Sequence, residues 1–150
     1  MRLVIQRVSQ ASVSINAIQK SSIQKGLLVL LGIEEDDNTD DINYLVSKLI
    51  ALRIFSDEDG KMNLDVKQVH GQILLVSQFT LHASTKKGNR PSFIKAAKPE
   101  KAEHMYRLFI TEIAKQHGQN PQTGSFGADM QIALINDGPV TIIMDSKMKE

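Results

Sequence analysis

Short runs of apolar side chains recur along most of the chain, and their spacing predicts β-strands. Residues 1–9 alternate between apolar and polar positions, and Val13 and Ile15 repeat the alternation in a second short strand. Alternation with a period of two is typical of a strand with one buried face. Residues 27–33 and 73–76 are apolar without interruption, which favours strands buried on both faces. Further extended segments are predicted at residues 53–55, 130–135 and 140–144.

Two other segments show helical spacing. Asn38 or Thr39 is expected to cap the first helix. Asp40 and Asp41 favour its N-terminal end, because that end carries a partial positive charge. Its apolar stripe recurs at i, i+3, i+4, i+7 and i+8, through Ile42, Leu45, Val46, Leu49 and Ile50.

The second helix is predicted to begin at Pro99, which suits a first turn, and to end at Gly118, which suits a C-cap. Its apolar positions are Ala102, Met105, Tyr106, Phe109 and Ile113. Many strands and two main helices, without strict strand–helix alternation, predict an α+β fold with a barrel-like mixed sheet. We expect one domain over residues 1–150, with the tail from about residue 147 disordered.

Composition narrows the classes of protein that fit. The 150 residues suit one domain, and 41% hydrophobic with 23% charged residues is ordinary for a globular protein. The sequence has no cysteine, which excludes disulfides, thiolate zinc sites and a cysteine nucleophile. We expect a cytoplasmic protein, because there is no signal-peptide pattern and no apolar run nears the roughly 20 residues of a membrane span. A net charge of +1 is not that of a general nucleic-acid binder, so any RNA contact must be local.

Standard catalytic and cofactor motifs are missing from the sequence. It holds no Gly-x-Ser-x-Gly elbow, no Walker loop and no Gly-x-Gly-x-x-Gly, and we expect neither a cofactor nor a metal. The histidines lack the paired spacing of metal ligands; they are His70, His82, His104 and His117. An acidic stretch from residue 57 to 65 is weakly similar to a calcium loop but lacks the glycine and glutamate that such loops require, so it predicts an ordinary turn.

A polar segment, Ser77-Gln78-Phe79-Thr80, follows directly on the buried strand at residues 73–76. The end of a buried strand is a rigid place for a site. Gln78 is able to donate to a carbonyl oxygen, and the backbone N–H groups of Phe79 and Thr80 are able to form an oxyanion hole. Thr80 is a candidate nucleophile, although the sequence offers no obvious base for it. The alternative is a strand end that merely exposes polar residues to water.

A second segment, Asn136-Asp137-Gly138-Pro139, lies between two predicted strands. These are common turn residues, and a hairpin turn is the simplest interpretation. A trans Gly138–Pro139 bond is expected on frequency, since only about 5–6% of X–Pro bonds are cis. A cis bond would place two backbone carbonyls side by side, as an acceptor pair for an ammonium group and as a steric wall. Residue types alone leave both possibilities open.

Residues 82–98 show no clear period and predict a long loop, a feature that is often functional in compact domains. Its basic residues are Lys86, Lys87, Arg90, Lys95 and Lys98. The first three are candidate phosphate contacts, with plain solvation as the alternative. Farther on, Phe126 and Met130 are able to flank a purine, although both residue types more often pack in a core.

Over nearly its whole length the chain resembles the D-aminoacyl-tRNA deacylases of the DTD type. The matching stretches are residues 1–8, 25–32, 52–55, 60–63, 77–81, 90–93, 126–130 and 136–141. The specific signal is the Ser-Gln-Phe-Thr segment followed later by Asn-Asp-Gly-Pro-Val-Thr, and neither motif departs from the pattern of the family.

The resemblance implies a homodimer in which each subunit inserts a cis Gly138–Pro139 segment into its partner's pocket. Main-chain carbonyls of Gly138 and Pro139 would collide with an L side chain, whereas a D side chain or glycine would pass. Selection would thus work by rejecting the abundant L-aminoacyl-tRNA. The same filter would admit mischarged glycyl-tRNA(Ala).

The reaction implied by the resemblance is ester hydrolysis at the terminal adenosine of tRNA, with the 2′-hydroxyl of that nucleotide helping to activate water. Ser77, Gln78, Phe79 and Thr80 would position the ester and stabilise the oxyanion. Phe126 and Met130 would form the adenine pocket. A nucleophilic Thr80 stays as a second mechanism.

Two other functions fit the residues. One is a non-catalytic dimeric module that binds RNA ends, or associates with DNA, through the same pocket; the missing base and the basic loop favour it. The other is a hydrolase of small D-peptides that uses Thr80 as nucleophile.

Overall fold

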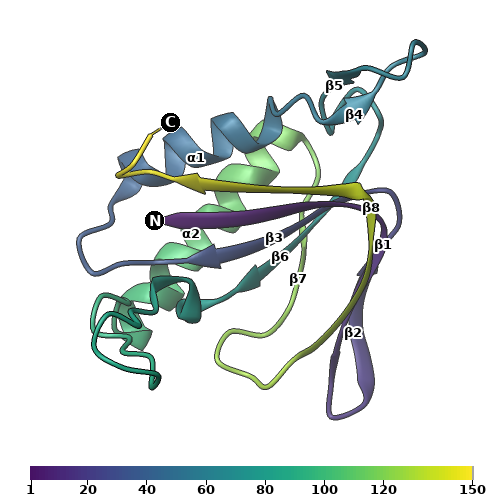
Figure 1. The fold of residues 1–150 in the computed structure, drawn as a ribbon. Coiled ribbons are helices and arrows are strands. Elements are labelled where there is room, and N and C mark those ends of the chain that lie inside the picture. Colours follow the sequence, from purple (N-terminus) through teal and green to yellow (C-terminus); the bar gives the residue numbers. More distant parts are fainter. Residues whose placement is uncertain (150) are drawn as a thin grey trace.

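The computed structural model describes residues 1–149, and its centre is a curved, nearly closed barrel-like sheet (Figure 1). The strands of this sheet are β1 (Arg2–Ile15), β2 (Ile18–Ile23), β3 (Gly26–Gly32), β6 (Gln72–Ser77), β7 (Gln122–Thr123) and β8 (Gln131–Asp145). Their order is β2-β1-β3-β6-β7, and β8 pairs with β1 along nearly its whole length. A short hairpin of β4 (Phe55–Ser56) and β5 (Met62–Leu64) stands apart. The predicted α+β class and mixed sheet are confirmed.

Two helices, α1 (Thr39–Ile50) and α2 (Pro99–His117), cover one face of the sheet (Figure 1). Asn38 caps α1 through its side chain, and Gly118 ends α2 in the left-handed conformation, as predicted. The apolar stripes of both helices meet fully buried strand residues such as Leu3 and Leu75, with Phe109 of α2 also fully buried. None of the helices within residues 1–149 is long and apolar enough to cross a membrane.

The parallel pairing of β3 and β6 determines where the polar segment lies. Gly26 pairs with Gln72 at one end and Leu31 with Ser77 at the other. The two strands approach so closely at Gly26 that a Cβ there would lie 1.9 Å from the backbone oxygen of Gln72. Beyond Ser77 the backbone N–H of Gln78 still donates to the carbonyl of Leu31 at 2.8 Å. Residues 77–80 are therefore held at the carboxyl ends of two buried parallel strands.

Two predicted strand boundaries were wrong. Residues 1–9 and the segment of Val13 and Ile15 form one strand, β1, and the predicted strands 130–135 and 140–144 also form one strand, β8. The Asn136–Pro139 segment is therefore not a hairpin turn. It is a bulge, because Gln6 pairs with Thr141 and Val8 already pairs with Asn136. Strand β2 was not predicted because its residues are mostly polar.

The segment 53–55 contributes only Phe55 to a strand. The predicted disorder from about residue 147 stays a prediction. Lys147 forms ion pairs with Asp37 and Asp41, and residue 150 lies outside the described residues.

Candidate functional site

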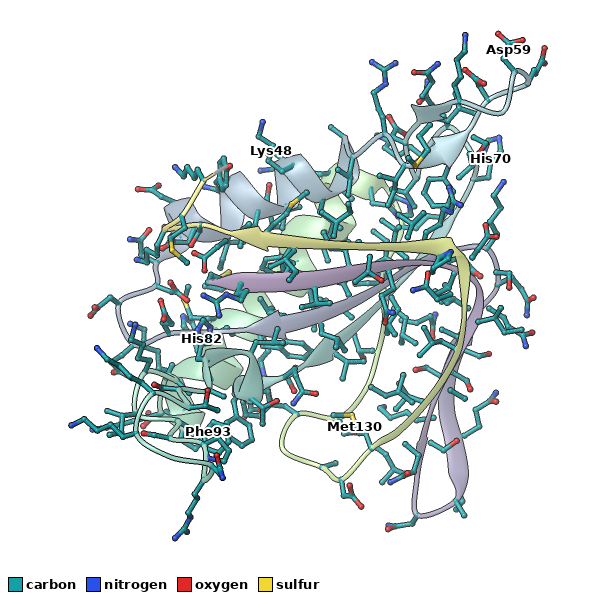
Figure 2. The ribbon with its side chains drawn as sticks, viewed as in Figure 1. Lys48, Asp59, His70, His82, Phe93 and Met130 are labelled. Carbon is teal, nitrogen blue, oxygen red and sulfur yellow. The ribbon has the colours of Figure 1, made fainter. Side chains whose placement is uncertain are left out.

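A cavity of about 670 Å³ opens at the carboxyl ends of β3 and β6. Its floor comes from those strand ends, and its walls come from the loop before α2 and from residues 126–130. Figure 2 labels Phe93 and Met130, one on each of these two segments. The polar and aromatic side chains that line it are Ser77, Gln78, Phe79, Phe93, Lys98, Phe126 and Asp129, with Met130 adding a thioether.

Three of the four residues in the polar segment line this cavity, namely Ser77, Gln78 and Phe79. After Gln78 the chain turns into a short 3-10 helix, η1 (Phe79–His82). Thr80 lies on η1, outside the lining residues, and its hydroxyl accepts a hydrogen bond from the side-chain amide of Gln78. The Phe79 ring is 57% exposed and meets the Phe93 ring edge to face, with centroids 5.0 Å apart.

The start of η1 presents unused backbone donors. The first N–H groups of a helix have no partner within it. The N–H of Leu81 donates to the Gln78 carbonyl, whereas within residues 1–149 the N–H groups of Phe79 and Thr80 donate to no protein acceptor. Two adjacent free donors beside a cavity are the arrangement that a developing oxyanion requires.

Phe126 and Met130 both line the cavity and also contact the core. The Phe126 ring packs on Tyr106 at 5.9 Å between centroids. Tyr106 is buried and donates to the carbonyl of Leu75 at 2.9 Å, and burial raises the pKa of its hydroxyl. The Met130 sulfur lies against Gly124, where a Cβ would come within 2.3 Å of it. These contacts hold one wall of the cavity in place.

Sequence reasoning missed Phe93, Lys98 and Asp129 as lining residues. Phe93 and Lys98 come from a loop with no periodicity, so no pattern signals that they turn inward. The only signals in the sequence for these lining residues were their positions. Phe93 follows a basic stretch, and Asp129 immediately precedes Met130.

The Gly138–Pro139 segment lies away from this cavity and does not line it. Its peptide bond is cis, and both residues are exposed. Arg7 braces the bulge, because its guanidinium donates to the carbonyls of Asp137 and Ile54. Arg7 pairs with Leu27, near the amino end of β3, whereas the cavity opens at the carboxyl end near Leu31. Four residues of strand separate these levels by about 13 Å.

Helix η1 is fixed to the sheet by charged groups outside the cavity. Arg2 donates to the carbonyl of Leu81 at 2.8 Å and forms two hydrogen bonds with Asp145 at 2.9 and 3.0 Å. The buried His82 contacts Glu34 through Nδ1 at 3.1 Å. Among residues 1–149, no three His, Cys, Asp or Glu residues come together in a way that could hold a metal.

Comparison with known proteins places this geometry in a family. The sequence profile of the D-Tyr-tRNA(Tyr) deacylases matches residues 4–145. The chain belongs to this family. A D-aminoacyl-tRNA deacylase of Flavobacterium psychrophilum is 61% identical over 150 residues, and one of Bacteroides thetaiotaomicron is 57% identical, with full coverage of both chains in each case.

Two solved structures share the fold of this chain. A c-Myc DNA unwinding element binding protein is 41% identical and superposes with a TM-score of 0.91, covering 97% of this chain and 98% of its own. A probable eukaryotic D-amino acid tRNA deacylase superposes with a TM-score of 0.82 over 95% of this chain and 97% of its own. At 17% identity it shows the shared fold alone.

The anchoring of η1 predicts a pH-dependent contribution of Asp145 to stability. Burial disfavours the charged carboxylate, but hydrogen bonds from Lys147, Arg2 and Met148 outweigh it and lower the pKa of Asp145 below 3.8. The carboxylate therefore stabilises the fold above that value, and this contribution is lost as the pH falls through the lowered pKa. We expect Asp145→Asn to reduce the free energy of unfolding by about 1–2 kcal/mol at pH 7.

Urea unfolding across pH measures this difference. The difference should be full near neutral pH and shrink below about pH 4, where the unfolded carboxyl takes up its proton before the folded one does. Glu58→Gln, at an exposed turn position, is the matched control and should stay within about 0.5 kcal/mol. A penalty for Asp145→Asn that persists unchanged at acid pH would contradict the role of the charge.

Proposed function

We propose that this protein is a carboxylic ester hydrolase that cleaves D-aminoacyl-tRNA to the free D-amino acid and tRNA. The observation that carries the proposal is the pair of free backbone N–H groups, on Phe79 and Thr80, at the edge of a cavity in a chain of the deacylase family. Such donors bind the negative oxygen that forms when an ester is attacked. We propose that the same ester hydrolysis also acts on mischarged glycyl-tRNA(Ala).

In the proposed reaction, water adds to the ester carbonyl and the carbonyl oxygen becomes an oxyanion held by the Phe79 and Thr80 N–H groups. The 2′-hydroxyl of the terminal ribose helps to remove the proton of the water. The tetrahedral intermediate then collapses, the bond to the ribose oxygen breaks, and that oxygen takes up a proton. Gln78 and Ser77 position the ester, since both line the cavity.

Phe126 and Met130 are proposed to hold the terminal adenine. The Phe126 ring and the Met130 thioether stand on the same wall of the cavity, and both are only partly buried. An aromatic face and a polarisable sulfur suit the flat surface of a purine. The cavity of about 670 Å³ has room for a nucleoside together with an amino acid.

Stereochemical selection is proposed to need a second copy of the chain. Within one subunit, Gly138 and Pro139 lie toward the opposite end of the sheet from the cavity, yet they are exposed on a braced bulge. The strand that carries them also exposes Ile135 and Ile143, at 52% and 68%. In the proposed homodimer, main-chain carbonyls of the partner subunit's Gly138 and Pro139 close the cavity, where they exclude an L side chain and admit a D side chain or glycine.

We propose that the protein is cytoplasmic, because proofreading of aminoacyl-tRNA has to take place where translation occurs. The reaction as written needs only water and groups of the enzyme and the tRNA, and it requires no cofactor.

The central assay compares D-tyrosyl-tRNA with L-tyrosyl-tRNA. We expect the D ester to be hydrolysed at least about 100-fold faster, because rejection removes only the L substrate from the cavity. Release of labelled tyrosine measures both rates, with buffer hydrolysis as the baseline. Equal rates on the two esters would overturn the proposed selection.

A non-catalytic module that binds RNA ends is the second candidate, favoured by the basic loop beside the cavity and by the c-Myc DNA unwinding element binding protein at 41% identity. It predicts saturable binding of D-tyrosyl-tRNA with no hydrolysis above the buffer rate. The same assay, read with a filter-binding measurement, therefore separates the two functions.

The role of Thr80 is tested by Thr80→Ala together with a substrate that ends in 2′-deoxyadenosine. Because the Thr80 hydroxyl lies outside the cavity lining and only accepts from Gln78, we expect Thr80→Ala to retain activity within about tenfold. The 2′-deoxy substrate should react about 100-fold or more slowly with the wild-type protein. A nucleophilic Thr80 predicts the reverse, namely near-complete loss in Thr80→Ala and little effect of the deoxy substrate.

A further inference from the structure

Positive charge is concentrated beside the cavity although the chain as a whole is almost neutral. Residues 82–99 contain five lysines and arginines and no aspartate or glutamate. This segment therefore carries +5, and the remaining residues together carry −4 within a total of +1. Such local asymmetry is the electrostatic footprint of a phosphate-binding surface.

These five residues form a surface that we call the basic rim: Lys86, Lys87, Arg90, Lys95 and Lys98. All five are exposed. Within residues 1–149 none of them forms an ion pair, whereas Arg2, Arg7 and Arg107 each contact a carboxylate. The charged groups of the rim are therefore not paired with carboxylates of the described residues.

The loop that carries the rim is anchored at the cavity. Ser84 and Ser92 form two mutual backbone hydrogen bonds of 2.8 and 2.9 Å, which close the tip of the loop. The next residue, Phe93, lines the cavity and packs on Phe79. Lys98 lines the cavity as well. Figure 2 shows nitrogen-tipped side chains that project outward from the loop around the labelled Phe93.

The three basic residues at the tip of the loop are separate from the chemistry. Lys86, Lys87 and Arg90 are not among the residues that line the cavity, so they lie outside it rather than at the ester. If the terminal adenosine of a tRNA occupies the cavity, the nucleotides that precede it leave the cavity on the side of this loop. The groups available to the rim there are the phosphates of those nucleotides.

We propose that the basic rim binds the phosphates of the tRNA acceptor end that precede the terminal adenosine, an inference that rests on the proposed function of the cavity. The rim positions the acceptor strand and does not identify its sequence, because lysine and arginine contacts to phosphate carry no base information. The rim contributes to the affinity for the polynucleotide and not to the rate of ester hydrolysis. It explains how a chain of net charge +1 engages RNA.

The test compares two substrates with the triple variant Lys86→Ala/Lys87→Ala/Arg90→Ala. On D-tyrosyl-tRNA we expect KM to rise about tenfold or more with kcat within about twofold, and the salt dependence of binding to weaken by about 2 in logarithmic slope. On 2′(3′)-O-D-tyrosyl-adenosine, which has no phosphate, kcat/KM should be unchanged. The control Lys20→Ala/Lys48→Ala/Lys61→Ala removes equal charge from exposed positions outside the rim and should leave both substrates unaffected.

Each of these kinetic results would overturn the proposed role of the basic rim: an unchanged KM for tRNA, an equal loss on both substrates, or an equal loss in the control variant. Direct binding of a fluorescent RNA hairpin that ends in single-stranded CCA keeps the test independent of turnover. We expect the triple variant to bind it about tenfold more weakly. A rim-dependent loss seen only with the corresponding DNA hairpin would also contradict the proposal. Wild-type protein that binds the RNA hairpin through the rim but hydrolyses neither ester would refute the proposed function alone.

Discussion

The parallel pairing of β3 with β6 is the constraint on which the site depends. Both strands are buried, and Gly26 lets their backbones approach at the amino end closely enough to exclude any side chain. The pairing holds through Leu31 and Ser77 and continues in the hydrogen bond from Gln78 to Leu31. The rigid strand ends therefore hold Ser77, Gln78 and the first turn of η1 together. The free N–H groups of that turn suit binding of an oxyanion because their position is fixed.

The second constraint is the long antiparallel pairing of β8 with β1. It carries the Gly138–Pro139 bulge toward the end of the sheet opposite the cavity, and Arg7 fixes the bulge there. One subunit thus holds a cavity at one end and an exposed, braced segment toward the other. In the proposed homodimer, a twofold axis brings the exposed segment of each subunit to the cavity of the other, and so joins the proposed hydrolytic site to the proposed stereochemical filter.

Much of the fold was predictable because it rests on local patterns. The stripe from Ile42 to Ile50 and the capping residues Asn38 and Gly118 predicted both helices, and the apolar runs predicted β3 and β6. The continuity of β8 was not predictable, because turn-forming residues in a bulge look the same as those in a hairpin until the partner strand is known. The cavity was half predictable: Ser77 and Gln78 follow a buried strand, whereas Phe93 comes from a loop whose path is set by tertiary contacts with Phe79 and the β3 end.

Subunit mixing tests the central claim, that each cavity is completed by the partner's Gly138–Pro139 segment. Gln78→Ala disables the cavity of its own subunit, and Gly138→Phe distorts the segment that would enter the partner's cavity, because a Cβ at Gly138 would lie 2.8 Å from the Arg7 guanidinium. Each variant, purified as a folded dimer, should be inactive on D-tyrosyl-tRNA. Co-expressed in equal amounts, they form mixed dimers with one intact site each, and the account predicts recovery of about a quarter of wild-type activity. Mixed dimers that recover no activity, although sedimentation and mass analysis show that they formed, would contradict it.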